Sequence, residues 1–435
     1  MQTTSSYSGA ILLLLIATLS FLPRSATAQS NPVDIIVNTT SDVADFGGAQ
    51  QVSDLPGPDG LISLREAILA ANNTPGPQVI GFNIPTSDPG FDGAVFTIEP
   101  LSPYFTLADG GTMIDGTTQA AFMGQANAAA PTIVLKGSSA GDASGLFLSS
   151  SGNVVRRLVI NRFRFAGVTI HGSSAVANVV EGNFIGTDAT GTAPEGNIQF
   201  GMFVAGEASN NVITGNLISG NQNIPFGAGV YIHGEGTLGN QVLGNLIGTD
   251  ITGTLPIPNG EEGVEVATAQ SSAVIAGNII AFNLQQGIVV FGNATISRNS
   301  IFSNGGLGID LGAPQGVNTN DPGDADAGPN ALMNFPVLSS AHAAPGRLVV
   351  KGTIDTPNPG TVTIEFFANP VPTPGSDPSG HGEGAVFLGT VRPNPQGTFT
   401  VALPPVAAGT FITATATDAN GNTSEFAENI AATFE

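Results

Sequence analysis

The motif Gly182-Asn-Phe-Ile185 recurs along the middle of the chain with the same order of glycine, asparagine and isoleucine. Its further copies are Gly215-Asn-Leu-Ile218, Gly244-Asn-Leu-Ile247, Gly277-Asn-Ile-Ile280 and the degenerate Arg298-Asn-Ser-Ile301. A second motif, a glycine followed by a short apolar strand, alternates with the first. Its copies are Gly167-Val-Thr-Ile170, Gly201-Met-Phe-Val204, Gly229-Val-Tyr-Ile232, Gly263-Val-Glu-Val266, Gly287-Ile-Val-Val290 and Gly308-Ile-Asp-Leu311. Two alternating motifs of this kind indicate a repeat architecture.

The spacing of the repeats indicates stacked coils. The asparagines of the first motif lie 33, 29, 33 and 21 residues apart. We interpret the shortest step as one bare coil and the longer steps as a coil with an insertion. The interval from each first-motif asparagine to the next second-motif glycine is 18, 13, 18, 9 and 9 residues. The interval from a second-motif glycine to the next first-motif asparagine varies less, between 12 and 16 residues. Loops on one face and a constant length elsewhere are typical of a solenoid.

Stacking also explains why such short strands can be stable. A strand of three to five residues does not survive alone, but stacked coils pair each strand with neighbours at about 4.8 Å. Side-chain alternation then predicts that the motif isoleucines form one interior column. The asparagine before each isoleucine is predicted to lie at a turn and to join an amide ladder, with ligand contact as the alternative. We expect the β-helix to begin near residues 80–110.

The ends of the repeat region have different patterns. Residues 59–72 predict an amphipathic helix in which Ser63 and Glu66 form a capping box, and we expect it to cover the end of the stack. After Pro336 the strands become longer and alternate, which predicts a small antiparallel, immunoglobulin-like β-sandwich.

The fold class is therefore all-β, a right-handed parallel β-helix followed by a sandwich. The predicted boundaries are a signal peptide at 1–28, a cap at 29–110, the β-helix at 111–336 and the sandwich at 345–435.

The N-terminus indicates export, and the composition limits the chemistry and the partners. An apolar run at residues 10–22 precedes Ala26-Thr-Ala28, the pattern of a signal peptide and its cleavage site. Because residues 1–9 carry no Lys or Arg, a retained membrane anchor is the alternative; cleavage would leave no membrane span.

The chain has no cysteine, which excludes a thiol nucleophile. Its 33 acidic and 11 basic residues give a net charge of −22, which argues against nucleic-acid and anionic-lipid partners.

Several segments resemble known surface proteins. Ser63-Leu-Arg-Glu-Ala67 resembles the N-terminal signature of CSLREA-type bacterial surface proteins. Ile114-Asp-Gly-Thr-Thr-Gln119, the Gly-Asn-x-Ile-Gly-Thr-Asp segments at 182–188 and 244–250, and residues 321–336 resemble pectin-lyase-like right-handed β-helix proteins. The sandwich resembles the domain that often ends such chains. The resemblance implies the architecture but no single activity, because this fold hosts lyases, hydrolases, epimerases, adhesins and tail spikes.

The coils offer few residues for catalysis, and we predict no catalytic residue. The resemblance implies that an enzyme of this fold would need clustered Asp with an Arg or Lys base, or three Asp with Gly-His-Gly and Arg-x-Lys. Basic residues cluster only between Arg156 and Arg164, and Gly380-His-Gly382 lies in the sandwich, where we expect a turn. His171 and His233 follow equivalent strands and are expected on one face, as turn-lining residues or as a ligand-contacting pair. Asp188 and Asp250 are expected to form turns, with a role as ligands as the alternative.

The strongest chemical signal is the loop at residues 318–330. Asp321, Asp324 and Asp326 lie at short spacing, with Gly323 to bend the chain. Carboxylate oxygens are the ligands that Ca²⁺ prefers. The sequence predicts a calcium site here, with an acidic interdomain hinge as the alternative.

Two functions therefore compete. The first is a secreted or cell-surface β-helix protein that binds a polysaccharide, a cell-surface glycan or another surface partner through the long face of the solenoid. The second is a polysaccharide lyase, glycoside hydrolase or epimerase. A cluster of two carboxylates with a base on one face of the coils would favour the second.

Overall fold

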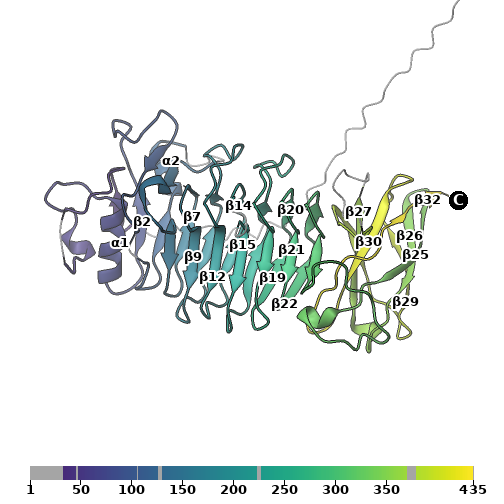
Figure 1. Cartoon of the computed structure of the whole chain (residues 1–435). Coiled ribbons are helices and arrows are strands. Elements are labelled where there is room, and N and C mark those ends of the chain that lie inside the picture. Colours follow the sequence, from purple (N-terminus) through teal and green to yellow (C-terminus); the bar gives the residue numbers. More distant parts are fainter. Residues whose placement is uncertain are drawn as a thin grey trace, which may run out of the picture. The chain divides into compact units, whose positions relative to one another are not determined.

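The computed structural model describes residues 33–45, 48–104, 106–125, 130–222, 227–369 and 379–434. The predicted signal peptide lies outside the described residues. Within the described ranges, no helix is long and apolar enough to cross a membrane. The chain is mostly β, and the predicted parallel β-helix is confirmed by three long parallel sheets (Figure 1).

From β7 onward, each coil contributes one strand to each of three sheets, which we call sheets A, B and C. Sheet A has nine strands, sheet B eight and sheet C seven. The strands of sheet A are β1 (Ile35–Val37), β2 (Val79–Phe82), β4 (Met113–Asp115), β7 (Val154–Arg156), β10 (Val179–Glu181), β13 (Val212–Thr214), β16 (Asn240–Leu243), β19 (Ser272–Ala276) and β22 (Asn293–Ser297). Those of sheet B are β3 (Phe96–Ile98), β5 (Ile133–Lys136), β8 (Leu158–Asn161), β11 (Phe184–Ile185), β14 (Leu217–Ile218), β17 (Leu246–Ile247), β20 (Ile279–Ala281) and β23 (Ser300–Phe302). Those of sheet C are β6 (Leu146–Leu148), β9 (Ala166–His171), β12 (Phe200–Ala205), β15 (Val230–His233), β18 (Val264–Val266), β21 (Ile288–Val290) and β24 (Ile309–Leu311).

The predicted isoleucine column is confirmed in sheet B. Ile185 pairs with Ile218, Ile218 with Ile247, and Ile247 with Ile280 in direct register. All four side chains are fully buried in the main core. Each buried isoleucine side chain stabilises the fold by about 2 kcal/mol, so the column makes the coils depend on one another.

The predicted asparagine ladder is also confirmed. Asn216 Oδ1 accepts both the backbone N–H and the side-chain Nδ2 of Asn183, at 2.9 and 3.1 Å. Asn216 Nδ2 in turn donates to the carbonyl of Val180 at 2.9 Å. The same bonds continue to Asn245, Asn278 and Asn299. Because every amide group in this buried ladder has a partner, it is a structural element rather than a binding site.

Two further ladders run parallel to the first and were not predicted. One ladder comprises Asn153, Asn178, Asn211 and Asn240. The other comprises Asn197, Asn221, Asn259, Asn283 and Asn304. The three ladders hold the turns of successive coils in register.

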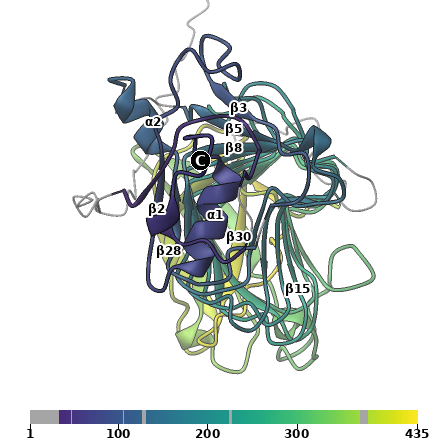
Figure 2. The same ribbon diagram turned by 90° about the vertical axis from the view of Figure 1, so that its left-hand side faces the viewer.

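Helix α1 (Leu64–Asn73) lies across the N-terminal end of the stack (Figure 2). Ser63 Oγ accepts the backbone N–H of Glu66, and the Glu66 carboxylate accepts the N–H of Ser63, so the predicted capping box is present. Leu64 and Ile68 are fully buried in the main core. The neighbouring Arg65 pairs with Asp42 at 2.7 Å, which gives this arginine a structural role.

Sheet A includes strands within residues 29–110, the segment predicted as the cap, and β1 lies before the predicted start of the β-helix near residues 80–110. Sheet A already contains β1 and β2, and Ile35 pairs with Ile80 and Ile80 with Ile114. The first coil includes α1, so it lacks the repeat motifs that identify the later coils. The remaining short elements are α2 (Thr117–Phe122) and 3₁₀ turns at Val52–Asp54, Gly137–Ser139, Pro329–Leu332 and Pro359–Thr361.

The C-terminal region forms two four-stranded, mainly antiparallel sheets. One contains β25 (Val337–Ala344), β26 (Arg347–Thr353), β29 (Thr398–Leu403) and β32 (Thr433–Phe434). The other contains β27 (Thr363–Asn369), β28 (Val386–Val391), β30 (Phe411–Thr417) and β31 (Ile430–Ala431). Side chains of both sheets, among them Leu348 and Phe366, share one core, as a sandwich requires.

Candidate functional site

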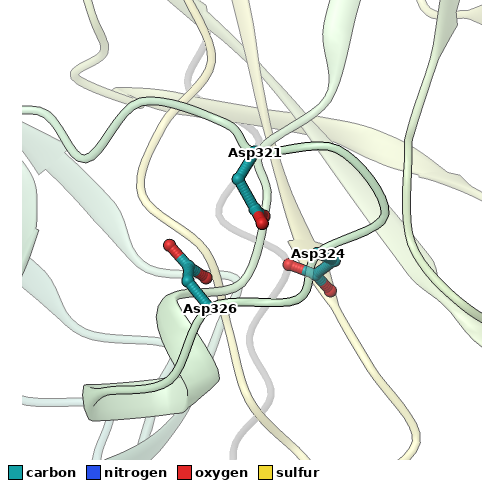
Figure 3. A group of neighbouring side chains, drawn as sticks. All are labelled: Asp321, Asp324 and Asp326. Carbon is teal, nitrogen blue, oxygen red and sulfur yellow. The ribbon is translucent and has the colours of Figure 1, made fainter.

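The acidic loop brings its three aspartates together. Asp321, Asp324 and Asp326 each place a carboxylate oxygen within 4.8 Å of the others. Figure 3 shows the three carboxylates facing a common space inside the loop. Burial, together with the charges of Asp321 and Asp324, raises the pKa of Asp326. The sequence therefore identified residues that do converge, while calcium binding stays a prediction.

Hydrogen bonds also hold part of this loop. Asp324 Oδ1 accepts the N–H of Asn334 at 2.7 Å, and its Oδ2 accepts the hydroxyl of Thr356 at 3.0 Å. Asp321 accepts the N–H of Ala325 at 3.1 Å. These bonds tie the loop to the start of the sandwich, so the alternative of an acidic hinge also has structural support.

The other sequence candidates occupy turns and strand ends. Asp188 accepts backbone N–H groups of Thr192 and Ala193, and Asp250 forms the equivalent turn in its own loop. These hydrogen bonds lower the pKa of both aspartates against the opposing effect of burial. His381 lies in the sandwich, where its Nδ1 is 3.0 Å from the carbonyl oxygen of Phe426.

His171 and His233 lie on one face, as expected. Both pair with Ala205, one from each side, so they are two coils apart on sheet C. His233 is exposed and its ring stacks on Tyr231 at 5.7 Å. Tyr231 belongs to an aromatic cluster that was not predicted from the sequence.

Sheet C carries an aromatic cluster on its outer face, which we call the aromatic shelf. It consists of Phe165, Phe200, Phe203 and Tyr231. Phe200 stacks on Tyr231 with ring centroids 4.7 Å apart, and Phe203 lies nearly parallel to Tyr231 at 5.9 Å. Phe203 and Tyr231 are partly exposed. Their strand neighbours Val204 and Ile232 point inward and are fully buried, so the shelf is formed by outward-facing alternate positions.

The next coil continues these outward positions with carboxylates. Tyr231 pairs in register with Glu265. Likewise, the position of Ala228 is occupied by Glu262 in the next coil. We call Glu261, Glu262 and Glu265 the glutamate cluster. The outward-facing column on sheet C therefore changes from aromatic to acidic within one strand spacing, roughly 4.8 Å.

The glutamate cluster has unusual electrostatics. Burial, followed by the charges of Glu262 and Glu261, raises the pKa of Glu265 to about 8. Burial also raises the pKa of Glu262 to about 7, with contributions from Glu261 and Asp310. The pKa of Tyr231 rises to about 12 through its burial and the charges of the same three glutamates. No Lys or Arg occurs between Arg164 and Arg298 to compensate these charges.

Two buried side-chain oxygens, one within the glutamate cluster and one in the next coil, have no hydrogen-bond partner. Glu262 is 7% exposed and its Oε2 is buried without a donor. Gln286, in the same column one coil further on, is 5% exposed, and its Oε1 is also without a donor. Its Nε2 donates to Asp310 at 3.2 Å. Unpartnered buried acceptors are costly, so each calls for an explanation such as a bound ligand, an ordered water or an ion.

A signal for this site was present in the sequence. The second residue after each glycine of the second motif faces outward, as Phe203, Tyr231 and Glu265 show. Aligning that position across the copies would have revealed the change from aromatic to acidic residues.

Comparison with known proteins adds no identification. No protein-family model matches the chain, and no curated protein matches it. The fold and the site geometry therefore carry the functional argument.

Proposed function

We propose that this chain is an exported or cell-surface β-helix protein that binds carbohydrate on the outer face of sheet C. The observation that carries the proposal is the aromatic shelf directly beside the glutamate cluster. Aromatic rings present flat apolar faces on which the C–H face of a sugar ring can stack, and carboxylates accept hydrogen bonds from its hydroxyl groups. A row of such groups along stacked coils suits an extended chain ligand.

Export and family membership belong to the same proposal. The apolar run at residues 10–22 and the Ala26-Thr-Ala28 cleavage pattern support secretion. The Ser63-Leu-Arg-Glu-Ala67 segment forms a capped helix at the end of the stack, which supports kinship with CSLREA-type β-helix proteins. The immunoglobulin-like character of the sandwich is likewise supported by its two packed sheets.

A glycoside hydrolase is the second candidate, and a specific observation favours it. Glycosidases pair a carboxylic acid of raised pKa with a second carboxylate. Glu262 and Glu265 lie in one cluster, with pKa values raised to about 7 and about 8. A carboxyl that is protonated at neutral pH is suited to general acid catalysis.

The calcium proposal concerns stability rather than recognition. We propose that the acidic loop binds Ca²⁺ through Asp321, Asp324 and Asp326 and so fixes the segment that joins the last coil to the sandwich. The convergence of three carboxylates within 4.8 Å supports it.

A binding and cleavage panel tests the proposed carbohydrate function. Purified protein is titrated with soluble oligosaccharides, and the same mixtures are assayed for newly formed reducing ends. The variant Phe203→Ala with Tyr231→Ala should weaken binding about tenfold or more, because buried aromatic contacts contribute about 2 kcal/mol each. The matched control is Phe282→Ala with Phe302→Ala, which removes an aromatic pair (ring centroids 5.4 Å apart) from the sheet B side. Equal loss in both variants would contradict the proposed site.

Cleavage separates the two candidate functions. A binding protein releases no reducing ends, whereas a hydrolase does, and Glu262→Gln should then abolish the release. A wild-type protein that neither binds nor cleaves any saccharide contradicts both.

A further inference from the structure

We infer that the glutamate cluster recognises a free amino group, so that the saccharide bound by sheet C is built from unacetylated amino sugars of the glucosamine class. This inference rests on the proposed carbohydrate function and specifies its ligand.

The site contains acceptors that lack donors. Glu262 Oε2 and Gln286 Oε1 are buried without hydrogen-bond partners. Their side chains lie in one column, one coil apart, beside Glu265. A protonated amine has three N–H donors and no acceptor, so it matches this set better than a hydroxyl, which also presents lone pairs. Charge-assisted hydrogen bonds of this kind are roughly twice as strong as neutral ones.

The charge of the surrounding coils disfavours an anionic ligand. Between Arg164 and Arg298 the sequence contains nine acidic residues and no Lys or Arg. The cations at the edge of this region, Arg162 and Arg164, pair with Glu195 and Asp142. A polyuronate would meet the like charges of Glu261, Glu262 and Glu265, which disfavours its binding. A polycationic chain would gain attraction from the same coils.

The carboxylates of the glutamate cluster do not form a tight group. Among the described residues, the acidic side chains whose ligand atoms all lie within 4.8 Å of one another are Asp321, Asp324 and Asp326. An ammonium group, which donates up to three separate hydrogen bonds, can be shared among acceptors that are not gathered around one point.

The aromatic shelf is placed to hold the sugar ring itself. Tyr231 and Glu265 are direct neighbours in register, roughly 4.8 Å apart along the stack. A pyranose ring stacked on Tyr231 would bring one of its substituents over Glu265. An ammonium group near the rings of Tyr231 and Phe203 would also gain cation–π attraction.

Binding of an ammonium should release protons. The groups that face Glu265 are Tyr231, Glu261 and Glu262, and Asp310 lies next to Glu262. All are acidic, and they hold Glu262 and Glu265 partly protonated near pH 7. A bound cation lowers the pKa of both carboxyls, so protons leave when the ligand binds.

The test compares four hexasaccharides of matched length by isothermal titration calorimetry. They are a glucosamine oligomer, its N-acetylated form, a neutral glucose oligomer and a galacturonate oligomer. We expect the wild-type protein to bind the glucosamine oligomer about tenfold or more tightly than the N-acetylated and neutral oligomers, and to release protons in buffers of different ionisation enthalpy. Glu262→Gln with Glu265→Gln should remove the preference and the proton release. The charge-matched control, Glu207→Gln with Glu235→Gln, removes two exposed carboxylates outside the cluster and should retain both.

Each outcome decides a separate question. Equal binding of the glucosamine and neutral oligomers would overturn the inference and leave the proposed carbohydrate function standing. Preferential binding of the galacturonate oligomer would overturn the inference and its charge argument. Failure to bind any oligomer would overturn the proposed function as well. Because the comparison among ligands uses the wild-type protein, it holds even if the double variant is unstable.

Discussion

Glu383 of the sandwich accepts hydrogen bonds from both the backbone N–H and the side-chain amide of Asn304, at 3.1 and 2.8 Å. Asn304 accepts the same two bonds from Asn283 in the coil before it. A glutamate from the sandwich therefore takes the position that the asparagine of a further coil would occupy, and the ladder ends without an unpaired amide.

Two other sandwich glutamates complete the same edge. Glu365 accepts the N–H of Arg298 at 2.8 Å, and Glu425 accepts the N–H of Leu311 at 3.0 Å. An uncovered parallel sheet edge invites pairing with another chain. The sandwich thus protects the C-terminal end of the stack, as α1 covers the N-terminal end.

Removing this capping acceptor should loosen the last coil. We expect Glu383→Ala to lower the free energy of unfolding by roughly 3 kcal/mol, because two buried donors lose a charged acceptor. Glu383→Gln keeps an acceptor oxygen and should cost less. Chemical denaturation measures both, with Glu428→Ala, an exposed neighbour, as control. Identical stabilities for the Ala variant and the wild type would contradict the capping role.

The core column predicts cooperative unfolding of several coils. Ile247→Asp places an unpaired charge in a fully buried position, which costs several kcal/mol. The matched control is Leu284→Asp, at a coil position that is 51% exposed, which should change stability little. Hydrogen exchange should show that neighbouring coils lose protection together in the first variant. Protection lost only at residue 247 itself would argue against a coupled stack.

Calcium should stabilise the wild-type protein if the acidic loop binds it. Millimolar Ca²⁺, binding with the affinity typical of extracellular calcium modules, adds about 1–3 kcal/mol to the free energy of unfolding. The change is Asp324→Ala with Asp326→Ala, and thermal melting with calcium and with chelator measures the effect. Asp326→Asn alone is a milder variant that leaves the Asp324 hydrogen bonds to Asn334 and Thr356 intact. No calcium-dependent change in melting or in protease sensitivity between residues 312 and 345 in the wild type would identify the loop as an acidic linker.

The buried glutamates predict how stability depends on pH. Glu262 and Glu265 have folded-state pKa values of about 7 and about 8, above the ordinary value of 4.5. A carboxyl whose pKa is raised by folding stabilises the protein fully below its unfolded pKa, and this contribution is lost as pH rises through the folded pKa. We expect stability to fall by on the order of 2 kcal/mol per group between about pH 4.5 and 8. Glu265→Gln should flatten this fall, whereas Glu207→Gln should not.

Much of the fold could be predicted because its signals recur. The Gly-Asn-x-Ile motif places a buried isoleucine and a ladder asparagine in every copy, and the capping box of Ser63 and Glu66 is local. The first coil had no such signal, since β1 and β2 are separated by the α1 segment. The glutamates that cap the last coil were also unpredictable, because Glu383 meets Asn304 across 79 residues of sequence.

The two candidate sites differ in the same way. The aspartates at 321, 324 and 326 are close in sequence, so their convergence follows from local spacing. The shelf and the glutamate cluster arise from register between coils: Phe203, Tyr231 and Glu265 come together only when three strands stack. Their inward-facing neighbours dominate the sequence pattern and conceal them.

A crystal structure of the protein with a bound glucosamine oligomer tests the account most directly. The account predicts a sugar ring stacked on Tyr231, with its amino group within hydrogen-bond distance of Glu265 or Glu262. An oligomer bound to sheet A, to sheet B or to the sandwich, with the outer face of sheet C bare, would contradict it.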